Sequence, residues 1–498
     1  MAHNTFIDAV TWPRGADLPD EAATIRLAED VATALAPGDV VALSGGLGAG
    51  KTTFARALLR ALADDAALEV PSPTFTLVQT YAAGRLTVAH VDLYRIGDPA
   101  ELAEIGFDEA AGNGVMLVEW PERAGGGLPP EALVIAFSIA GSGRRAEFSG
   151  GGSWALRIDR TFAIRNFLDR AGWPDAARRH LQGDASGRIY ERIRAGGRRA
   201  VLMNAPARIA SDYDRAAHRA VDVAPFIAVD GALREAGFSA PDIYAGEPEA
   251  GLLLLEDLGS DLLTRDGAAD PERYRAAVEA LAALHAVRRP ADLVRPEGTY
   301  RLPAYDSGAL MIEVSQFVDW YAARAAGGPL PAEAAEEFGS IWAALIGRLA
   351  GAEINWVLRD SHSPNLLWLA ERTGYKRVGL LDFQDALYGP SAYDVASLLQ
   401  DARATVPPAL EAALSTHYVT LRRRAGGFDE PRFHEAYAIL AAQRAMKVAG
   451  VFARLSTVGG KSFYLKHLPR VEGYLQRALT HPVLSPLLLW YEKRLPRP

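Results

Sequence analysis

The sequence predicts an α/β protein in which a mostly parallel sheet is followed by a two-lobed region with a mainly helical second lobe. Three observations lead to this prediction. Apolar strands alternate with amphipathic helices over residues 1–155, as in proteins with parallel sheets. From Thr161 a helix and paired strands come first, and the chain then becomes mainly helical. The 498 residues are too many for one hydrophobic core and favour two or three domains.

Composition narrows the class of protein. The net charge of −8 argues weakly against a nucleic-acid or anionic-membrane binder, and no strong nucleic-acid signal is found. The chain has no cysteine, which excludes disulfides, thiolate metal sites and a cysteine nucleophile. It has no apolar run of about 18 residues, so no membrane-spanning helix is expected. The first residues do not resemble a signal peptide. We therefore expect a cytoplasmic protein with no membrane partner.

The elements of the first domain follow from periodicity and from turn residues. We expect a first helix that ends at Pro37-Gly38, a short buried strand, and a second helix that starts at Lys51. The predicted elements are a helix over 22–35, a strand over 39–45, a helix from Lys51, strands over 85–92 and 114–120, and a hairpin over 133–149. A glycine-rich loop follows this hairpin, and we place the first domain at residues 1–159.

The second region is predicted to contain two lobes, at residues 160–257 and 258–498. Its first lobe begins with an amphipathic helix and continues with alternating strands that meet at Gly196-Gly197. The predicted elements are a helix over 160–173, two strands within 186–206, a buried strand leading into a helix over 251–264, and a hairpin of 365–370 with 377–383. The rest of the second lobe is expected to be mainly helical.

A phosphate-binding loop lies between the first strand and the second helix. The pattern Gly45-x4-Gly50-Lys51-Thr52 is the complete P-loop motif in its required strand–helix context. Glycines let backbone N–H groups turn toward phosphates, and the helix start adds its positive dipole end. Lys51 can neutralise the β- and γ-phosphates and Thr52 can ligate Mg²⁺. The predicted nucleotide ligands are Gly45, Gly46, Gly48, Ala49, Gly50, Lys51, Thr52 and Thr53.

Two acidic residues follow apolar strands in the same region. Asp92 and Glu119 end predicted strands, and the carboxyl ends of parallel strands line the ligand crevice of an open sheet. Either carboxylate can hold the metal through its water shell or orient an attacking water. The alternative is that each is a solvated acid at a strand end.

Residues 20–155 resemble the TsaE family, the ATPase subunit of the bacterial machinery that makes threonylcarbamoyladenosine in tRNA. The resemblance rests on the segments "LSGGLGAGKTTFARALL", "VPSPTFTLVQTY", "HVDLYR" and "VEWPER". It implies that Thr52 and Glu119 bind Mg²⁺, that Asp92 is needed for ATP hydrolysis, and that Trp120 packs near the nucleotide. It also implies a switch-like loop at residues 74–76 and two partner subunits, TsaB-like and TsaD-like. From the residues alone, a generic P-loop ATPase or kinase stays open.

A second phosphate-handling pattern lies far downstream. Asp360-x4-Asn365, a predicted hairpin and then Asp382 follow the order of protein-kinase-like phosphotransferases. In that arrangement Asp360 accepts the proton of the attacking hydroxyl, while Asn365 and Asp382 hold Mg²⁺. By itself the Asp-x4-Asn spacing occurs by chance in many proteins. Combined with the hairpin and the second aspartate, it predicts an active site.

Flanking segments fit a kinase-like nucleotide site. Residues 183–193 are predicted to form a small-residue loop and first strand over the ATP phosphates, with ligands from Asp184, Ser186 and Gly187. Residues 253–259 are predicted to form the hinge strand beside the adenine. His285 is interpreted as structural. His362, inside the catalytic loop, is assigned either to the substrate or to loop packing.

Residues 161–420 resemble the aminoglycoside-phosphotransferase-like kinases, and within them the N-acetylmuramate/N-acetylglucosamine anomeric kinases of cell-wall recycling (AmgK-like). The resemblance rests on "GDASGRIYER", "LMNAP", "YDSGALMIEVSQFVDWY", "LRDSHSPNLLWL" and "LLDFQDALYGPSAYDVASLLQDAR". It implies transfer of the γ-phosphoryl group of ATP to the C1 hydroxyl of N-acetylmuramate or N-acetylglucosamine. It also implies that Asp360 is the catalytic base and that Asn365 and Asp382 are the magnesium ligands.

The chain departs from the common phosphotransferase pattern at three places. Leu358, followed by Arg359, stands where the loop usually has His, and Gln384 replaces the glycine after the second aspartate. Met203 stands where a strand lysine usually grips phosphates, and Arg188, Arg192 or Arg199 are the possible replacements. For the sugar, the candidate ligands are Arg359, His362, Glu313, Asp319, Trp320 and Tyr321, with helix packing as the alternative for the last four.

Three functions are compatible with these patterns. The first is a bifunctional protein that supports tRNA modification and phosphorylates an amino sugar. The second is a single sugar or small-molecule kinase whose P-loop domain is a nucleotide-binding regulator. The third is a nucleotide-binding scaffold, which is disfavoured because both sites keep their acids and metal ligands. ATP and Mg²⁺ are the expected cofactors.

Overall fold

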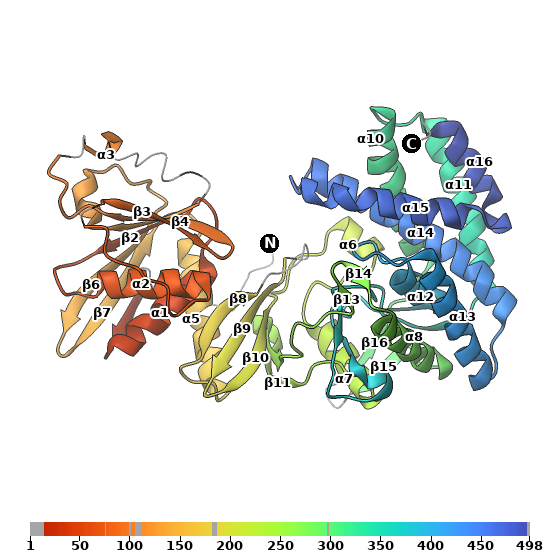
Figure 1. The fold of residues 1–498 in the computed structure, drawn as a ribbon, viewed down its shortest axis with the longest axis horizontal. Coiled ribbons are helices and arrows are strands. Elements are labelled where there is room, and N and C mark those ends of the chain that lie inside the picture. Colours follow the sequence, from red (N-terminus) through yellow and green to blue (C-terminus); the bar gives the residue numbers. More distant parts are fainter. Residues whose placement is uncertain are drawn as a thin grey trace. The chain divides into compact units, whose positions relative to one another are not determined.

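The computed structural model describes residues 14–74, 76–98, 101–104, 112, 114–181, 187–295 and 298–495. The chain forms two compact units (Figure 1). Unit 1 contains residues 1–205 and 244–257, and unit 2 contains residues 206–243 and 258–498. Unit 1 ends after residue 257, and the second segment of unit 2 begins there. Residues 206–243 belong to unit 2, although they precede the last two strands of unit 1.

A seven-stranded sheet forms the N-terminal part of unit 1, in the order β1-β7-β6-β2-β5-β4-β3. Its four central strands, β6, β2, β5 and β4, are parallel, and β3, β7 and β1 pair antiparallel at the edges. This confirms the predicted α/β fold class, with parallel strands in the centre of a mixed sheet. The elements are β1 (Arg14–Leu18), α1 (Glu21–Ala34), β2 (Val40–Ser44), α2 (Lys51–Ala63), β3 (Val78–Ala83), β4 (Leu86–Asp92), α3 (Glu101–Glu104), β5 (Val115–Glu119), β6 (Leu133–Ala140) and β7 (Gly143–Gly150).

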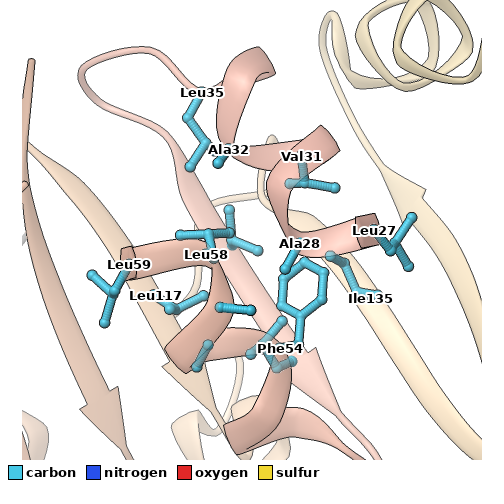
Figure 2. Close-up of a cluster of buried hydrophobic side chains, with 14 of the residues drawn as sticks. Leu27, Ala28, Val31, Ala32, Leu35, Phe54, Leu58, Leu59, Leu117 and Ile135 are labelled. Carbon is cyan, nitrogen blue, oxygen red and sulfur yellow. The ribbon is translucent and has the colours of Figure 1, made fainter. Parts of the chain in front are cut away.

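Helices α1 and α2 cover one face of this sheet (Figure 2). The Asp20 carboxylate caps α1 by accepting a hydrogen bond from the backbone N–H of Ala23, at 2.7 Å. Phe54 and Leu58 of α2 are fully buried against Leu117 of β5 and Ile135 of β6. Because α2 begins at Lys51, directly after the phosphate loop, this packing fixes the position of the loop.

A second, five-stranded sheet completes unit 1, in the order β11-β12-β10-β9-β8, and β12, β10, β9 and β8 pair antiparallel. Helix α5 runs through the predicted domain boundary at Asp159. Its first half packs Trp154 and Ile158 into the core of the first sheet, and its second half packs Phe167 and Leu168 against the second. The elements are α5 (Trp154–Arg170), β8 (Ala177–Leu181), β9 (Ile189–Ala195), β10 (Arg198–Asn204), β11 (Ile243–Glu247) and β12 (Leu252–Glu256).

Two details of this second sheet differ from the sequence predictions. The predicted first strand, β9, is the second strand, because β8 comes before it in the chain and pairs with it. The predicted helix after Leu255 does not form. Residues 258–263 contain no helix, and the two-residue strands β13 (Thr264–Arg265) and β14 (Ala268–Ala269) follow. The apolar pair Leu262-Leu263 reflects burial and a bridge from Leu262 to Leu367, not helical periodicity.

A buried ion-pair network joins the two sheets of unit 1. The Asp30 carboxylate of α1 accepts hydrogen bonds from Arg165 of α5, at 2.6 and 2.9 Å, and from Arg178 of β8, at 3.0 Å. Arg178 also donates two bonds to the Glu191 carboxylate of β9, at 2.7 and 2.8 Å. The side chains of Arg178, Asp30 and Glu191 are at most 6% exposed. Paired charges of this kind are costly to break, because the partner left behind stays buried.

A more exposed part of the same network reaches the end of α2. Asp64, the residue that ends this helix in a left-handed conformation, forms ion pairs with Arg179 of β8 (3.2 Å) and Arg194 of β9 (3.4 Å). Arg179 also pairs with Glu29 of α1 at 2.8 Å. The helix that starts at the phosphate loop is therefore tied at its other end to the strands that flank residues 182–186.

Unit 2 is mainly helical, as predicted for the second lobe (Figure 1). Its long central helix α14 packs against α9, α12, α15 and the π-helical segment after α9. The predicted hairpin is confirmed as β18 paired antiparallel with β19. The elements are α6 (Asp212–Ala216), α7 (Ala224–Glu235), α8 (Pro271–Ala286), β15 (Asp292–Arg295), β16 (Gly298–Arg301), α9 (Ser307–Gln316), the π-helix Phe317–Ala322, α10 (Ala323–Ala326), α11 (Ala332–Arg348), β17 (Ile354–Val357), β18 (Leu366–Trp368), β19 (Val378–Leu380), β20 (Leu387–Pro390), α12 (Ala392–Leu399), α13 (Pro408–Ala425), α14 (Glu430–Thr457), α15 (Leu468–Leu479) and α16 (Ser485–Arg494).

Candidate active sites

The phosphate loop of unit 1 lines a cavity of about 310 Å³ at the carboxyl ends of the parallel strands. Gly45, Gly48 and Gly50 have φ values of 131°, 71° and 110°, which favour glycine. A Cβ on Gly45 would lie 2.3 Å from the carbonyl oxygen of Phe137, so the loop has no space for a side chain there. The cavity-lining residues are Leu47, Gly48, Ala49, Gly50, Lys51, Thr52, Thr53, Ser72, Thr74, Asp92, Tyr94, Glu119 and Trp120.

Lys51 lies folded against its own loop. Its Nζ donates hydrogen bonds to the carbonyl oxygens of Gly45 (2.7 Å) and Gly46 (3.0 Å). The same nitrogen lies 3.6 Å from the ring centroid of Trp120, in a cation–π contact. Burial lowers the pKa of Lys51, while Glu119, Glu122 and Asp92 oppose this shift. The side chain is thus positioned by weak acceptors that phosphate oxygens can replace.

The two predicted acids lie in the same cavity and have different partners. Glu119 accepts a hydrogen bond from Thr52 Oγ1 at 2.8 Å, and its other oxygen lies 3.0 Å from Nε2 of His90. A hydroxyl and a carboxylate held together at a helix start fit an octahedral Mg²⁺ site, which takes oxygen ligands. The predicted pair Thr52 and Glu119 is therefore brought together by the fold.

Asp92 instead holds the loop of residues 72–77. One carboxylate oxygen accepts hydrogen bonds from Ser72 (2.9 Å) and Thr74 (3.0 Å), and the other accepts one from the backbone N–H of Tyr94. Thr74 lines the cavity, as expected for a loop that responds to the nucleotide. Asp92 is therefore not a merely solvated acid at a strand end, because it is 3% exposed.

Among the residues of this site that were not found from the sequence, two hold other site residues in place. His90 is fully buried and orients Glu119, and Arg144 of β7 donates two hydrogen bonds to the carbonyl oxygen of Gly48, at 3.0 and 3.1 Å. His90 lies in the segment "HVDLYR", two residues before Asp92, so strand alternation gave a signal. Arg144 lies 96 residues from its partner and follows no local pattern.

The second candidate site, in unit 2, combines the three predicted residues of the catalytic loop and hairpin. The Asn365 amide nitrogen donates to the backbone oxygen of Asp360 (3.1 Å) and lies 3.3 Å from Asp382. Gln384 donates to the other Asp382 oxygen at 2.7 Å. Asp360, Asn365 and Asp382 are all partly exposed. Amide and carboxylate oxygens are the ligands that Mg²⁺ takes together with substrate phosphates.

Two buried carboxylates hold the catalytic loop by its backbone. Asp394 of α12 accepts hydrogen bonds from the backbone N–H groups of Leu358 (2.6 Å) and Arg359 (2.9 Å). Asp401 accepts one from Ser363 at 2.7 Å. Burial raises the pKa of Asp394 to about 7, against the opposing effect of these hydrogen bonds. Both residues lie in a segment that carries the family resemblance, but their role was not predicted.

Electrostatics favour an ionised Asp360. Burial raises the pKa of this carboxyl, but His362, Lys447, Arg219 and Arg359 outweigh that effect and lower it to about 2. His362 has its Nδ1 4.0 Å from Asp360 Oδ1, and burial lowers its own pKa to about 4. A carboxylate that is ionised at neutral pH can accept a proton from a hydroxyl.

The remaining predicted sugar ligands lie in several places. Glu313 is fully buried and Arg359 is 1% exposed, and they pair with each other, which agrees with the packing alternative for Glu313. Tyr321 donates a hydrogen bond to Glu472 of α15 at 2.6 Å. Asp319 is exposed and Trp320 is half-buried, on the same π-helical segment.

In the nucleotide-loop region, Asp184 and Ser186 lie outside the described residues, and Gly187 has a φ of 79°. Met203 is fully buried on β10 and pairs across the ladder with Tyr190. Arg192 is one of the three arginines considered as replacements for the strand lysine. It lies opposite Val201, on the same face of the sheet as Met203. It is 3.8 Å from Asp257.

Across the described ranges, every helix is too short or too polar to cross a bilayer. Within the same ranges, no cluster of three or more His, Cys, Asp or Glu side chains is arranged as a metal site. The two predicted Mg²⁺ sites need only one carboxylate each, together with a hydroxyl or an amide and the phosphates of the nucleotide.

Fold and site geometry define the class of this protein: a phosphotransferase with a kinase-like catalytic loop, joined to a P-loop domain. Residues 178–428 match the phosphotransferase enzyme family (APH). Residues 18–146 match the family described as threonylcarbamoyl adenosine biosynthesis protein TsaE. The chain belongs to the phosphotransferase enzyme family through its C-terminal part and to the TsaE family through its N-terminal part.

Individual relatives agree with this two-part match. The N-acetylmuramate/N-acetylglucosamine kinase of Caulobacter vibrioides is 36% identical over 68% of this chain and 98% of its own length. That of Pseudomonas aeruginosa is also 36% identical, over 64% of this chain and 89% of its own. The tRNA threonylcarbamoyladenosine biosynthesis protein TsaE of Rickettsia felis is 38% identical over 26% of this chain and 74% of its own. The chain is an ATP-dependent phosphotransferase fused to a TsaE domain.

Proposed function

We propose that unit 2 supplies the catalytic groups of an anomeric sugar kinase whose substrate is N-acetylmuramate or N-acetylglucosamine, with a role in cell-wall recycling. The observation that carries this proposal is the Asp360–Asn365–Asp382 cluster on a loop held by Asp394. The sugar itself is inferred from the kinases that this chain resembles. ATP and Mg²⁺ are the cofactors, and the cytoplasm is the compartment where these substrates meet.

In the proposed reaction, the C1 hydroxyl oxygen of the sugar attacks the γ-phosphorus of ATP. Asp360 accepts the hydroxyl proton, the bond from the γ-phosphorus to the bridging oxygen breaks, and ADP leaves. Asn365 and Asp382 hold Mg²⁺, which offsets the charge of the phosphates. His362 and the π-helical residues Asp319, Trp320 and Tyr321 stay candidates for contact with the sugar.

A panel of sugars tests this proposal. The full chain is incubated with ATP, Mg²⁺ and each sugar, and phosphorus NMR locates the new phosphate. We expect phosphate on C1 of N-acetylmuramate or N-acetylglucosamine, and at least 100-fold less product with Asp360→Asn. Phosphate on another hydroxyl would contradict the anomeric assignment, and no product from any sugar would contradict the kinase assignment.

For the N-terminal domain we propose an ATPase that supports threonylcarbamoyl transfer to tRNA together with TsaB-like and TsaD-like partner subunits. Thr52 and Glu119 hold Mg²⁺, Lys51 contacts the phosphates, and Asp92 links hydrolysis to the loop of residues 72–77. The contacts of Asp92 with Ser72 and Thr74 support this last role. We propose residues 1–159, 160–257 and 258–498 as the functional divisions of the chain.

One observation favours the alternative of a regulatory P-loop domain. Helix α2 starts at the phosphate loop and ends at Asp64, which pairs with Arg179 and Arg194 on β8 and β9. A nucleotide-dependent shift of α2 would reach the second sheet through these pairs, and coupling of this kind is reciprocal. The test is the KM of the sugar kinase for ATP in Lys51→Ala, because only the regulatory function predicts a change of more than about fivefold.

A further inference from the structure

The catalytic loop has an arginine where its backbone favours glycine. Arg359, directly before Asp360, has a φ of 71°, a conformation that side-chain-bearing residues adopt rarely and at a cost in free energy. Its guanidinium is also buried, with 1% of the side chain exposed. A residue that is both strained and charged inside the protein needs strong compensating interactions.

Glu313 of α9 provides one of them. Its Oε1 accepts hydrogen bonds from Nε of Arg359, at 3.1 Å, and from Nη2 of the same residue. Lys447 of α14 donates to that oxygen at 2.7 Å, while Tyr305 (2.5 Å) and Gln443 (3.2 Å) donate to Oε2. Burial raises the pKa of Glu313, but Arg359 and Lys447 outweigh this and hold it below its usual range. Both oxygens of the Glu313 carboxylate therefore accept hydrogen bonds from side chains of the protein.

The backbone at the same position is held separately. The N–H of Arg359 donates to Asp394 at 2.9 Å, and its carbonyl oxygen accepts a bond from Ser397 at 3.5 Å. The side chain of Arg359 is held by Glu313 of α9, which α14 holds in turn through Gln443 and Lys447, and its peptide groups are held from α12. The next residue is Asp360, whose carboxylate direction depends on the backbone torsions of Arg359.

We propose that Arg359, held by the buried Glu313 carboxylate, is a positioning residue for the catalytic base Asp360. In this role the guanidinium fixes the backbone directly before Asp360 and does not touch the sugar. This inference rests on the proposed function, because it needs Asp360 to be the base. It assigns Glu313 and Arg359 a role that differs from the predicted sugar contact.

Two substitutions separate positioning from simple stabilisation. Arg359→Gly removes the guanidinium and at the same time relieves the backbone strain, and Glu313→Gln keeps the shape of the partner without its charge. In each we expect kcat of the sugar kinase to fall about 10- to 100-fold, as for small displacements of catalytic groups. The KM values for ATP and for the sugar stay within about twofold, because neither residue contacts them.

Further variants complete the design. Arg359→Lys keeps a positive charge beside Glu313 and is expected to recover part of kcat. The double variant R359G/E313Q is expected to be no slower than the worse single variant, since both changes break the same pair. Arg422→Met is the matched control: Arg422 is 3% exposed and pairs with Glu353 elsewhere in unit 2. It should lower the melting temperature and leave kcat unchanged.

Several outcomes would overturn the inference. A folded Arg359→Gly protein with unchanged kcat would show that the guanidinium does not position the base. Additive losses in the double variant would show that the two residues act separately. Unfolding of every variant at positions 313 and 359 would assign the pair to stability alone. Absence of kinase activity in the wild-type chain would instead contradict the proposed function, so the two failures are distinguishable.

Discussion

At the scale of single residues, the phosphate loop depends on a glycine that the fold cannot replace. Gly45 combines a φ of 131° with a backbone oxygen 2.3 Å from the position of a Cβ. Gly45→Ala is therefore expected to lower the free energy of unfolding of unit 1 by about 1–3 kcal/mol. It should also weaken ATP binding at the loop. Denaturant unfolding and a nucleotide titration measure the two effects.

The matched control is the neighbouring glycine. Gly46 has no atom within 4 Å of its Cβ position and no positive φ. Gly46→Ala should keep the wild-type stability. Equal stability of both alanine variants would show that the contact with Phe137 does not constrain the loop.

A buried histidine in unit 2 predicts a loss of stability in acid. His285 is 2% exposed, and its Nδ1 lies 2.9 Å from the Tyr418 hydroxyl. Burial, with smaller effects of Arg422 and Arg289, lowers its pKa from 6.5 to about 3. A depressed pKa in the folded state favours the neutral ring. The stability from this group is complete above pH 6.5 and is lost as the pH falls toward 3.

When the pH falls from 7 to 4.5, the free energy of unfolding should decrease in both proteins. We expect the decrease in His285→Gln to be about 2–3 kcal/mol smaller than in the wild type. Chemical unfolding at a series of pH values, followed by tryptophan fluorescence, measures this difference. His434→Gln is the control for the exchange of a histidine at an exposed position, because 49% of the His434 side chain is exposed. If the free energy of unfolding changed with pH equally in His285→Gln and in the wild type, His285 would not be the source of the acid sensitivity.

At the scale of elements, the two sheets of unit 1 are held together by Arg178. Arg178→Met leaves the Asp30 and Glu191 carboxylates buried and without this partner, so we expect a loss of about 3–5 kcal/mol of unfolding free energy. Thermal unfolding of the variant should show the first sheet and the second sheet separating into two transitions. Limited proteolysis within α5 would detect the same separation.

Arg170→Met is the control for this element. Arg170 pairs with Glu247 at the surface, where 62% of its side chain is exposed. Exposed pairs contribute little to stability, so this variant should unfold as the wild type does. A single, unshifted transition in Arg178→Met would show that the buried pairs do not join the sheets.

Elements with strong local patterns were predictable from the sequence. The phosphate loop between β2 and α2 and the β18–β19 hairpin follow from glycine spacing, strand patterns and turn residues. Elements set by distant contacts were not predictable. Strand β8 pairs with β9, which follows it in the chain. The leucines after Leu255 are apolar because the segment is buried, and they do not form a helix.

The same distinction applies to the candidate sites. Asp92 and Glu119 were proposed as site residues because each stands at the carboxyl end of a predicted strand. In an open parallel sheet, these strand ends line the ligand crevice. Arg144, Asp394 and Lys447 were missed as site residues, because each reaches its partner across at least 35 residues of sequence. For Glu313 the sequence left sugar contact and packing open, because a carboxylate near aromatic residues fits a sugar pocket and a buried ion pair equally well.

At the scale of the whole molecule, the chain has two phosphate-handling sites built on different principles. In unit 1, the glycine loop and a helix start line the cavity proposed for the phosphates. In unit 2, an aspartate, an asparagine and a second aspartate form the catalytic cluster. Each site has its own acids and candidate metal-ligand types. The central claim is that the two sites perform separate reactions.

Crossed variants of the full chain test this claim most directly. Lys51→Ala and Asp360→Asn are each assayed for sugar phosphorylation and, with TsaB-like and TsaD-like subunits, for threonylcarbamoyl transfer to tRNA. We predict that Lys51→Ala abolishes transfer and keeps sugar-kinase kcat within about twofold, while Asp360→Asn does the reverse. Loss of both activities in either folded variant, or normal transfer by Lys51→Ala, would contradict the account.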